Sequence, residues 1–126
     1  MERYLEDPRP RGPPPRDGVY KVSLPRSDLQ VNLDARRLET GVGLACWVAF
    51  YACPCGRTMA MGDTCLPRAQ LQPALDALRK GGVEITAIHH HLLGEDTRVM
   101  FMHFEGEGDA FAIARAVRAA WDTLRK

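Results

Sequence analysis

The chain has 126 residues, of which 45% are hydrophobic and 26% are charged, and its formal net charge is +1. This length favours one domain, and the composition is typical of a soluble globular protein. Because 17 basic residues are offset by 16 acidic residues, the charge balance gives no support to nucleic-acid binding.

The first 18 residues, MERYLEDPRPRGPPPRDG, are rich in Pro, Arg and Gly. They predict an extended arm ahead of a single domain over residues 19–126. The arm contains no apolar segment of the kind that a secretory signal needs, and no window of the sequence is apolar over the length that spans a bilayer. We therefore expect a cytoplasmic protein that contacts no membrane. In that reducing compartment its four cysteines are expected to be thiols or ligands.

Alternation of apolar and polar residues predicts two half-buried strands after the arm. Residues 19–25, VYKVSLP, alternate and end at Pro25, and residues 29–34, LQVNLD, alternate again. Residues 43–52, GLACWVAFYA, are nearly all apolar and predict a strand that is buried on both faces. The sequence CPCGR then forms a turn, and residues 58–66, TMAMGDTCL, return as the second strand of a hairpin.

The apolar pattern changes to a helical period after Pro67. Three leucines repeat at helical spacing, and two glycines end the segment: Leu71, Leu75, Leu78, Gly81 and Gly82. A β-branched strand over residues 83–91, VEITAIHHH, and its hairpin partner over residues 98–104, RVMFMHF, follow. Asp109 is the expected N-cap of a last helix, with an apolar stripe of Phe111, Ala114, Val117, Ala120 or Trp121, and Leu124. This order predicts an α+β fold, a mostly antiparallel sheet with two helices packed on it.

All four histidines lie in the predicted hairpin of residues 83–104. Residues two apart in a strand share a face, so His89 and His91 point the same way and His90 points oppositely. His103 shares the face of His89 when the connecting loop has an odd number of residues, for example the seven residues 92–98. It then lies diagonal to His89, roughly 7–8 Å away. An even loop would place His103 on the face of His90 instead, and the sequence does not fix the loop length.

Three neutral imidazoles beside an open or carboxylate position suit a divalent transition metal such as Zn, Cu or Fe. The spacing therefore predicts a metal site formed by His89, His91 and His103. Glu95 is the nearest acid, as a fourth ligand or a general base, and Asp63 and Asp96 are further carboxylates. The opposing interpretation is that these histidines bond to backbone carbonyls or acids and bind nothing. Three histidines at this spacing favour the metal.

Sulfur-bearing residues offer a second kind of chemistry. Cys53 and Cys55 form a C-x-C pair in a turn, which suits either clamping a soft ion such as Cu(I) or a redox disulfide. Cys46 and Cys65 fall on predicted strands, where a cysteine is most often a small buried apolar residue. The alternating methionines are more simply core residues than thioether ligands: Met59, Met61, Met100 and Met102.

Several long blocks resemble, in order, the LppY/LpqO family, a bacterial family of uncharacterised function: GVYKVSLPRSDLQVNLDARRL, MAMGD, GVEITAIHHHLLGEDTRVMFMHFEGEGD and ARAVRAAWDTL. The resemblance runs from about Gly18 to the C-terminus. The family's motif reads His-Asn-His-Leu-Leu-Gly-Glu, with Met-His on the following strand. The resemblance implies that the family's histidines, acid and Gly-Asp pair fall on His89, His91, His103, Glu95, Gly62 and Asp63. His90 takes the place of the motif's Asn.

Members of that family are often about twice this length, with two similar halves and an export or lipoprotein leader. This chain resembles one half without the leader, and the resemblance implies a homodimer in place of the two halves. The Cys-Pro-Cys turn is not a general feature of the family.

Three hypotheses about function stay open at this point. The first is a metal-binding protein for metal handling or sensing, with the cysteine pair as an auxiliary soft site. The second is a small metal-dependent enzyme, hydrolytic or oxygen-using, in which Glu95 moves protons. The third is a structural or interaction module whose histidines are inert.

Overall fold

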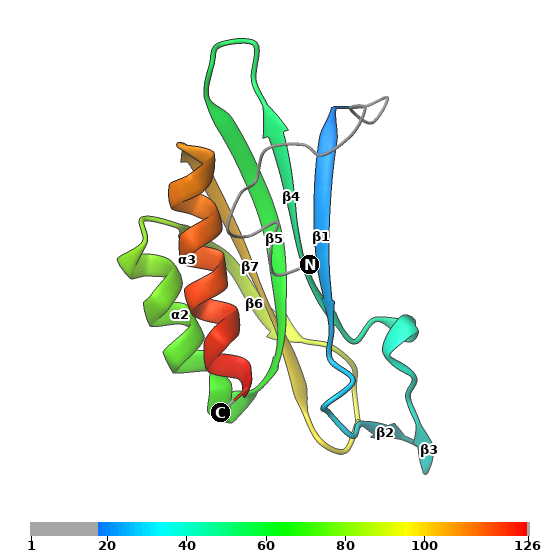
Figure 1. The fold of residues 1–126 in the computed structure, drawn as a ribbon. Coiled ribbons are helices and arrows are strands. Elements are labelled where there is room, and N and C mark those ends of the chain that lie inside the picture. The colour runs from blue at the N-terminus through cyan, green and yellow to red at the C-terminus, as the bar shows by residue number, and fades with distance from the viewer. Residues whose placement is uncertain (1–17, 126) are drawn as a thin grey trace.

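The described part of the protein consists of strands followed by two helices that are separated by a hairpin (Figure 1). The structure, a computed structural model, describes residues 18–125. The predicted arm of residues 1–18 falls, apart from Gly18, outside the described residues. The elements within the range are β1 (Val19–Pro25), β2 (Asn32–Leu33), β3 (Arg36–Arg37), η1 (Thr40–Val42), β4 (Ala45–Ala52), β5 (Thr58–Pro67), η2 (Arg68–Gln70), α2 (Leu71–Lys80), β6 (Glu84–His90), β7 (Val99–Gly108), α3 (Ala110–Asp122) and η3 (Thr123–Arg125).

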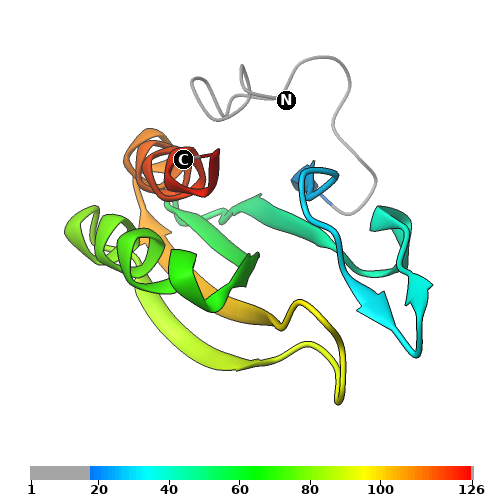
Figure 2. The same cartoon turned by 90° about the horizontal axis from the view of Figure 1, so that it is seen from below.

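Five of the strands in this range form one sheet in the order β1-β4-β5-β7-β6, and every neighbouring pair is antiparallel. The central pair is continuous, from Thr58 opposite Gly108 to Pro67 opposite Val99. Figure 2 shows both helices on one face of this sheet. The predicted α+β fold, with two helices packed on an antiparallel sheet, is therefore confirmed.

The two faces of the sheet have different surroundings. The indole Nε1 of Trp121 donates to Thr64 Oγ1 at 3.3 Å, so Thr64 points at α3 and its neighbour Asp63 points away from the helices. The core lies on the helix side and includes Val48, Ala60, Leu78, Met102, Phe104, Ile113 and Val117. On the other face, Met59 and Met61 are 49% and 55% exposed. The prediction that these two methionines are core residues is wrong, because they alternate with the residues that face the helices.

The apolar sequence of β4 predicted a strand that is buried on both faces, and this prediction is wrong because only one face is fully buried. Cys46, Val48 and Phe50 are buried, whereas the residues between them, Trp47 and Ala49, are half-buried. The helices cover one face only, and the aromatic surface of Trp47 is instead partly covered by Lys21, whose Nζ lies 4.6 Å from the ring centroid. The apolar run is continuous because the residues on the face without helices are also apolar, either small (Ala49) or aromatic (Trp47).

The predicted strand over residues 29–34 is wrong for most of its length. Its apolar residue Val31 is buried, but the strand pairing is confined to β2, which pairs with β3. Asp34 and Ala35 both have a positive φ, 51° and 63°. Two consecutive left-handed residues fit a two-residue hairpin turn. The chain therefore reverses before a long strand can form.

Helix α3 begins as the sequence predicts, because Asp109 Oδ2 accepts a hydrogen bond from the backbone N–H of Ala112 at 3.0 Å. Of its predicted stripe, Phe111 is half-buried and the remaining residues are buried. Helix α2 tolerates Pro73 in its first turn, where a missing N–H costs little. No helix in residues 18–125 is long and apolar enough to cross a membrane.

Replacing this cap, Asp109→Ala, is expected to lower the free energy of unfolding by about 1 kcal/mol, since the N–H groups of the first turn lose their acceptor. Urea denaturation followed by circular dichroism measures the change. Glu84→Ala, at an exposed position of β6, is the control and should stay within about 0.5 kcal/mol of the parent protein. Equal stability of both variants would contradict the capping role.

Candidate functional site

The hairpin of β6 and β7 has the register on which the histidine prediction depended. His89 pairs with Phe101, and the backbone N–H of His91 donates to Val99 O at 2.9 Å. The connection is therefore the seven residues 92–98, an odd number, and His103 lies diagonal to His89 on the same face. His103 also pairs with Asp63 across β5 and β7, which places this face on the side away from the helices.

His89 and His103 bring their ring nitrogens together, with the two Nε2 atoms 2.7 Å apart. Nδ1 of His89 lies 2.9 Å from the backbone carbonyl oxygen of His90. Because a carbonyl oxygen only accepts, Nδ1 is the protonated nitrogen and Nε2 of the neutral ring carries the lone pair. A backbone carbonyl that fixes the tautomer in this way is a common partner of metal-binding histidines.

Asp63 is the acid that meets this pair. Its Oδ2 lies 3.5 Å from Nε2 of His103, and the residue is only 6% exposed. Burial raises the pKa of the Asp63 carboxyl, and the neighbouring His103 and His89 offset part of that rise. His103 therefore has a second imidazole nitrogen and a carboxylate oxygen as neighbours, on the face of the sheet away from the helices.

His91 lies beside this group, next to Phe101 and Gly43. The rings of His91 and Phe101 have centroids 4.7 Å apart, and a Cβ at Gly43 would lie 3.0 Å from Cε1 of His91. Gly43 also has a φ of +98°, a backbone angle that residues with a side chain rarely adopt. Burial lowers the pKa of His91. The charge of Glu95 acts in the opposite direction and raises it, and His89 lowers it further. A lowered pKa keeps the imidazole neutral near pH 7, the form that binds metals.

Glu95 is buried although it lies in the connection between β6 and β7. Its Oε1 accepts a hydrogen bond from the backbone N–H of Val99 at 3.0 Å. Its other oxygen, Oε2, has no hydrogen-bond partner among the described residues. Two further buried atoms lack a hydrogen-bond partner among residues 18–125, namely Oδ1 of Asp63 and Nε2 of His91. No other buried side-chain nitrogen or oxygen in that range lacks one. Buried polar atoms are nearly always paired, so this concentration marks the site as a place for a water, an ion or a ligand.

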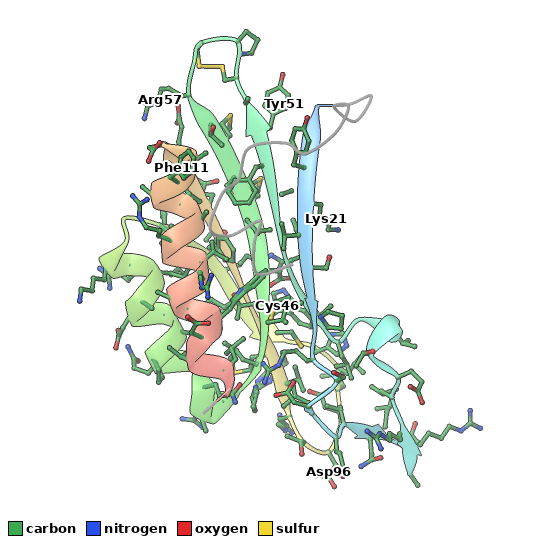
Figure 3. All side chains as sticks on the ribbon, viewed as in Figure 1. Lys21, Cys46, Tyr51, Arg57, Asp96 and Phe111 are labelled. Atoms are coloured by element: carbon green, nitrogen blue, oxygen red, sulfur yellow. A yellow bond between two sulfur atoms is a disulfide. The ribbon has the colours of Figure 1, made fainter. Side chains whose placement is uncertain are left out.

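The structure does not bring every predicted ligand to one point. In the described part of the chain, no group of three or more His, Cys, Asp or Glu side chains is placed to hold one ion as it stands. His89 and His103 meet, while His91 lies beside Phe101. His90 pairs with Met100 and is exposed. Figure 3 places the disulfide that joins Cys53 and Cys55 at the opposite end of the molecule from Asp96.

The segment between β1 and β4 covers part of the site, and no local pattern predicted this. Asn32 forms an isolated bridge with Asp96, in which the Asp96 N–H donates to Asn32 O at 2.8 Å. Figure 2 shows β2 and β3 close to the connection between β6 and β7, on the side away from the helices. Gly43, near His91, was therefore missed, since its role depends on contacts between distant parts of the sequence.

Comparison with known proteins gives one result that bears on identity. No curated protein and no solved structure matches this sequence. Residues 13–123 match the family described as Domain of Unknown Function (DUF1259). The matched range contains β1 to α3 and with them all the histidines and acids of the site. Because the match covers far more than half of the chain, the chain belongs to this family of unknown function.

Proposed function

We propose that the protein binds a divalent transition metal (Zn, Cu or Fe) through His89, His91 and His103, with Asp63 and Glu95 as the carboxylates of the site. The observation that carries the proposal is the 2.7 Å approach of the Nε2 atoms of His89 and His103 beside the buried Asp63. Imidazole nitrogens and carboxylate oxygens are usual ligands of these ions. A metal-binding protein that handles or senses metal is the function that this geometry supports best.

Small side-chain rotations would adapt the group to an ion. Two nitrogens bound to one tetrahedral zinc are about 3.3 Å apart, since each Zn–N bond is about 2.0–2.1 Å. The two rings would therefore separate by a few tenths of an ångström. His89 is exposed and the His103 side chain is 35% exposed, so both have room to rotate. His91 shares their face, and its partnerless Nε2 is the third nitrogen of the proposed set.

The test is the stability of the protein in the presence of metal. A ligand that binds the folded state alone raises the free energy of unfolding by about 2.7 kcal/mol at a free concentration of 100 times its Kd. We expect Zn²⁺ or Co²⁺ to produce such a rise in urea denaturation. His90→Ala is the matched control and should respond as the parent protein does. No rise with Zn²⁺, Cu²⁺ or Fe²⁺ would contradict the proposal and favour a module with inert histidines.

A small metal-dependent enzyme is the second candidate, and the observation that favours it is the free oxygen of Glu95. A buried carboxylate with one uncommitted oxygen beside His91 is suited to accept a proton from water at the ion, as hydrolysis requires. The two candidates differ in whether the ion keeps an open position. Azide would change the absorption spectrum of the Co²⁺-loaded protein if such a position exists, and would leave it unchanged if protein ligands fill the shell.

Replacing Asp63→Asn is expected to have opposite effects on stability and on binding. Burial raises the pKa of Asp63 above its ordinary value of 3.8, so the carboxylate costs stability once the pH rises above that value. The variant should therefore be more stable than the parent protein at pH 7 without metal, and the difference should vanish as the pH falls through 3.8. Its Kd for Zn²⁺ should rise by about 10-fold to 100-fold.

Urea denaturation across this pH range and calorimetric titration with Zn²⁺ measure the two effects. A variant that binds Zn²⁺ as tightly as the parent protein would remove Asp63 from the site. A variant that is less stable than the parent protein at pH 7 would show that the contact with His103 outweighs the cost of burial.

The resemblance to the LppY/LpqO family, the homodimer that it implies and the cytoplasmic location stay predictions. Light scattering during gel filtration checks the oligomeric state directly. A mass of twice that of the chain is the expected result, and the mass of a single chain would contradict the homodimer. The same measurement with and without Zn²⁺ tells whether metal and assembly are linked.

A further inference from the structure

The turn between β4 and β5 carries a pair of cysteines that the proposed metal site does not use. Cys53 and Cys55 flank a single proline and are joined by a disulfide. Cys53 is half-buried and Cys55 is exposed. Figure 3 shows the bond at the tip of the hairpin, at the end of the molecule opposite Asp96. The pair is therefore accessible from solvent and remote from the histidines.

This disulfide contributes little to holding the turn. The backbone N–H of Cys53 donates to Arg57 O at 2.7 Å, and the N–H of Gly56 donates to Cys53 O at 2.9 Å. These bonds close the hairpin without the sulfur atoms. In addition, the stabilisation that a disulfide gives by restricting the unfolded chain grows with the loop that it encloses, and here the loop encloses one residue. A structural role does not explain the pair.

The other two cysteines provide a contrast within the same chain. Cys46 and Cys65 are buried free thiols. Burial raises the pKa of Cys46 to about 11 and that of Cys65 to about 12. Since the thiolate is the reactive form, both are expected to be inert in the folded protein. At the hairpin tip, by contrast, the backbone N–H of Cys55 donates to Sγ of Cys53 at 3.2 Å, a contact that favours negative charge on that sulfur.

We propose that Cys53 and Cys55 form a site of reversible thiol–disulfide exchange, with glutathione or a similar small thiol as the co-reactant. In the reducing direction, the incoming thiolate attacks Sγ of the exposed Cys55, the protein S–S bond breaks, and Cys53 leaves as a thiolate. A second thiolate attacks the external sulfur of the mixed disulfide and releases Cys55 as a thiolate. The protein gains two electrons and takes up two protons, and two thiols become one external disulfide. This site is independent of the proposed metal function.

The test is to equilibrate the folded protein without oxygen in buffers of varied ratio of reduced to oxidised glutathione. Iodoacetamide then labels free thiols, and mass spectrometry counts them. We expect two labels to appear together in reducing buffers and to disappear together in oxidising buffers, on Cys53 and Cys55. Cys46 and Cys65 should be labelled only after unfolding. A pair that stays oxidised in a large excess of reduced glutathione, or that never re-forms with oxidised glutathione, would overturn the proposal.

A single variant gives a second readout that does not depend on the equilibrium. In Cys53→Ser, the remaining Cys55 should form a mixed disulfide with oxidised glutathione at least tenfold faster than the buried thiols of the same molecule. The variant changes an exposed turn whose backbone hydrogen bonds remain, so its urea denaturation should match that of the parent protein. Equal rates at Cys55 and at the buried thiols of the folded variant would contradict the proposal.

Discussion

Alanine at both His89 and His103 is expected to weaken the proposed binding of Zn²⁺ or Co²⁺ at least about 100-fold, because two of the proposed nitrogen ligands are removed together. Their Nε2 atoms are the pair that approaches to 2.7 Å. Isothermal calorimetry with each ion measures the Kd. The Kd of each single variant should rise at least about tenfold. The Kd of His91→Ala should rise about as much if its Nε2 completes the ligand set.

His90→Ala is the matched control for these variants. It removes an imidazole from the same strand but keeps the backbone carbonyl that accepts the hydrogen bond of His89 Nδ1. Its Kd should therefore stay within about twofold of the parent value. A tenfold change would correspond to about 1.4 kcal/mol of binding free energy. A double variant that folds and binds as tightly as the parent protein would exclude His89 and His103 as ligands.

Alanine at Gly62 is expected to destabilise the protein by about 3 kcal/mol, the upper part of the usual range for overpacking. Gly62 precedes Asp63 in β5, and an added Cβ would overlap the ring of Phe104 and lie 2.5 Å from the backbone oxygen of Trp47. The backbone of β4 cannot yield as a flexible side chain does. The clash should also shift Asp63, which is adjacent, so that metal binding weakens as well.

Urea denaturation measures the loss of stability, and Gly41→Ala provides the control. A Cβ at Gly41 would meet no atom within 4 Å, so this variant should stay within about 0.5 kcal/mol of the parent protein. A Gly62→Ala protein as stable as the parent would mean that β4 and β5 adapt to the added methyl group. The glycine would then not be required for the position of Asp63.

Local patterns predicted the elements that alternate or repeat regularly. The strand β1, the hairpin of β4 and β5, both helices and the cap at Asp109 follow from periods of two or 3.6 residues and from one capping residue. These patterns are short-range. They failed where contacts between distant parts of the sequence determine the local structure. In the segment after β1, for example, Asp34 and Ala35 reverse the direction of the chain.

Arg26 illustrates a core contact that no local pattern reveals. It is 1% exposed, and its guanidinium donates to Asp28, to the backbone oxygen of Cys65 and to Gln70. Those partners come from three separate parts of the sequence. An arginine followed by a nearby aspartate looks like an ordinary surface pair until the fold surrounds it.

The candidate site was predicted to the extent that it lies within one hairpin. The parity of the loop decided whether His103 joins His89, and the structure has the odd loop. The approach of Asp63 depends on the pairing of β5 with β7, which the sequence did not specify. His91 lies next to Phe101 and near Gly43, and Gly43 belongs to a segment far away in the sequence.

The measurement that tests the central claim most directly is the metal content of the protein purified without a polyhistidine tag, by elemental analysis beside the His89→Ala, His103→Ala double variant. The metal-site proposal predicts about one transition-metal ion per chain in the parent protein and its loss in the variant. No metal in either protein, after incubation with Zn²⁺, Cu²⁺ and Fe²⁺ and desalting, would contradict it.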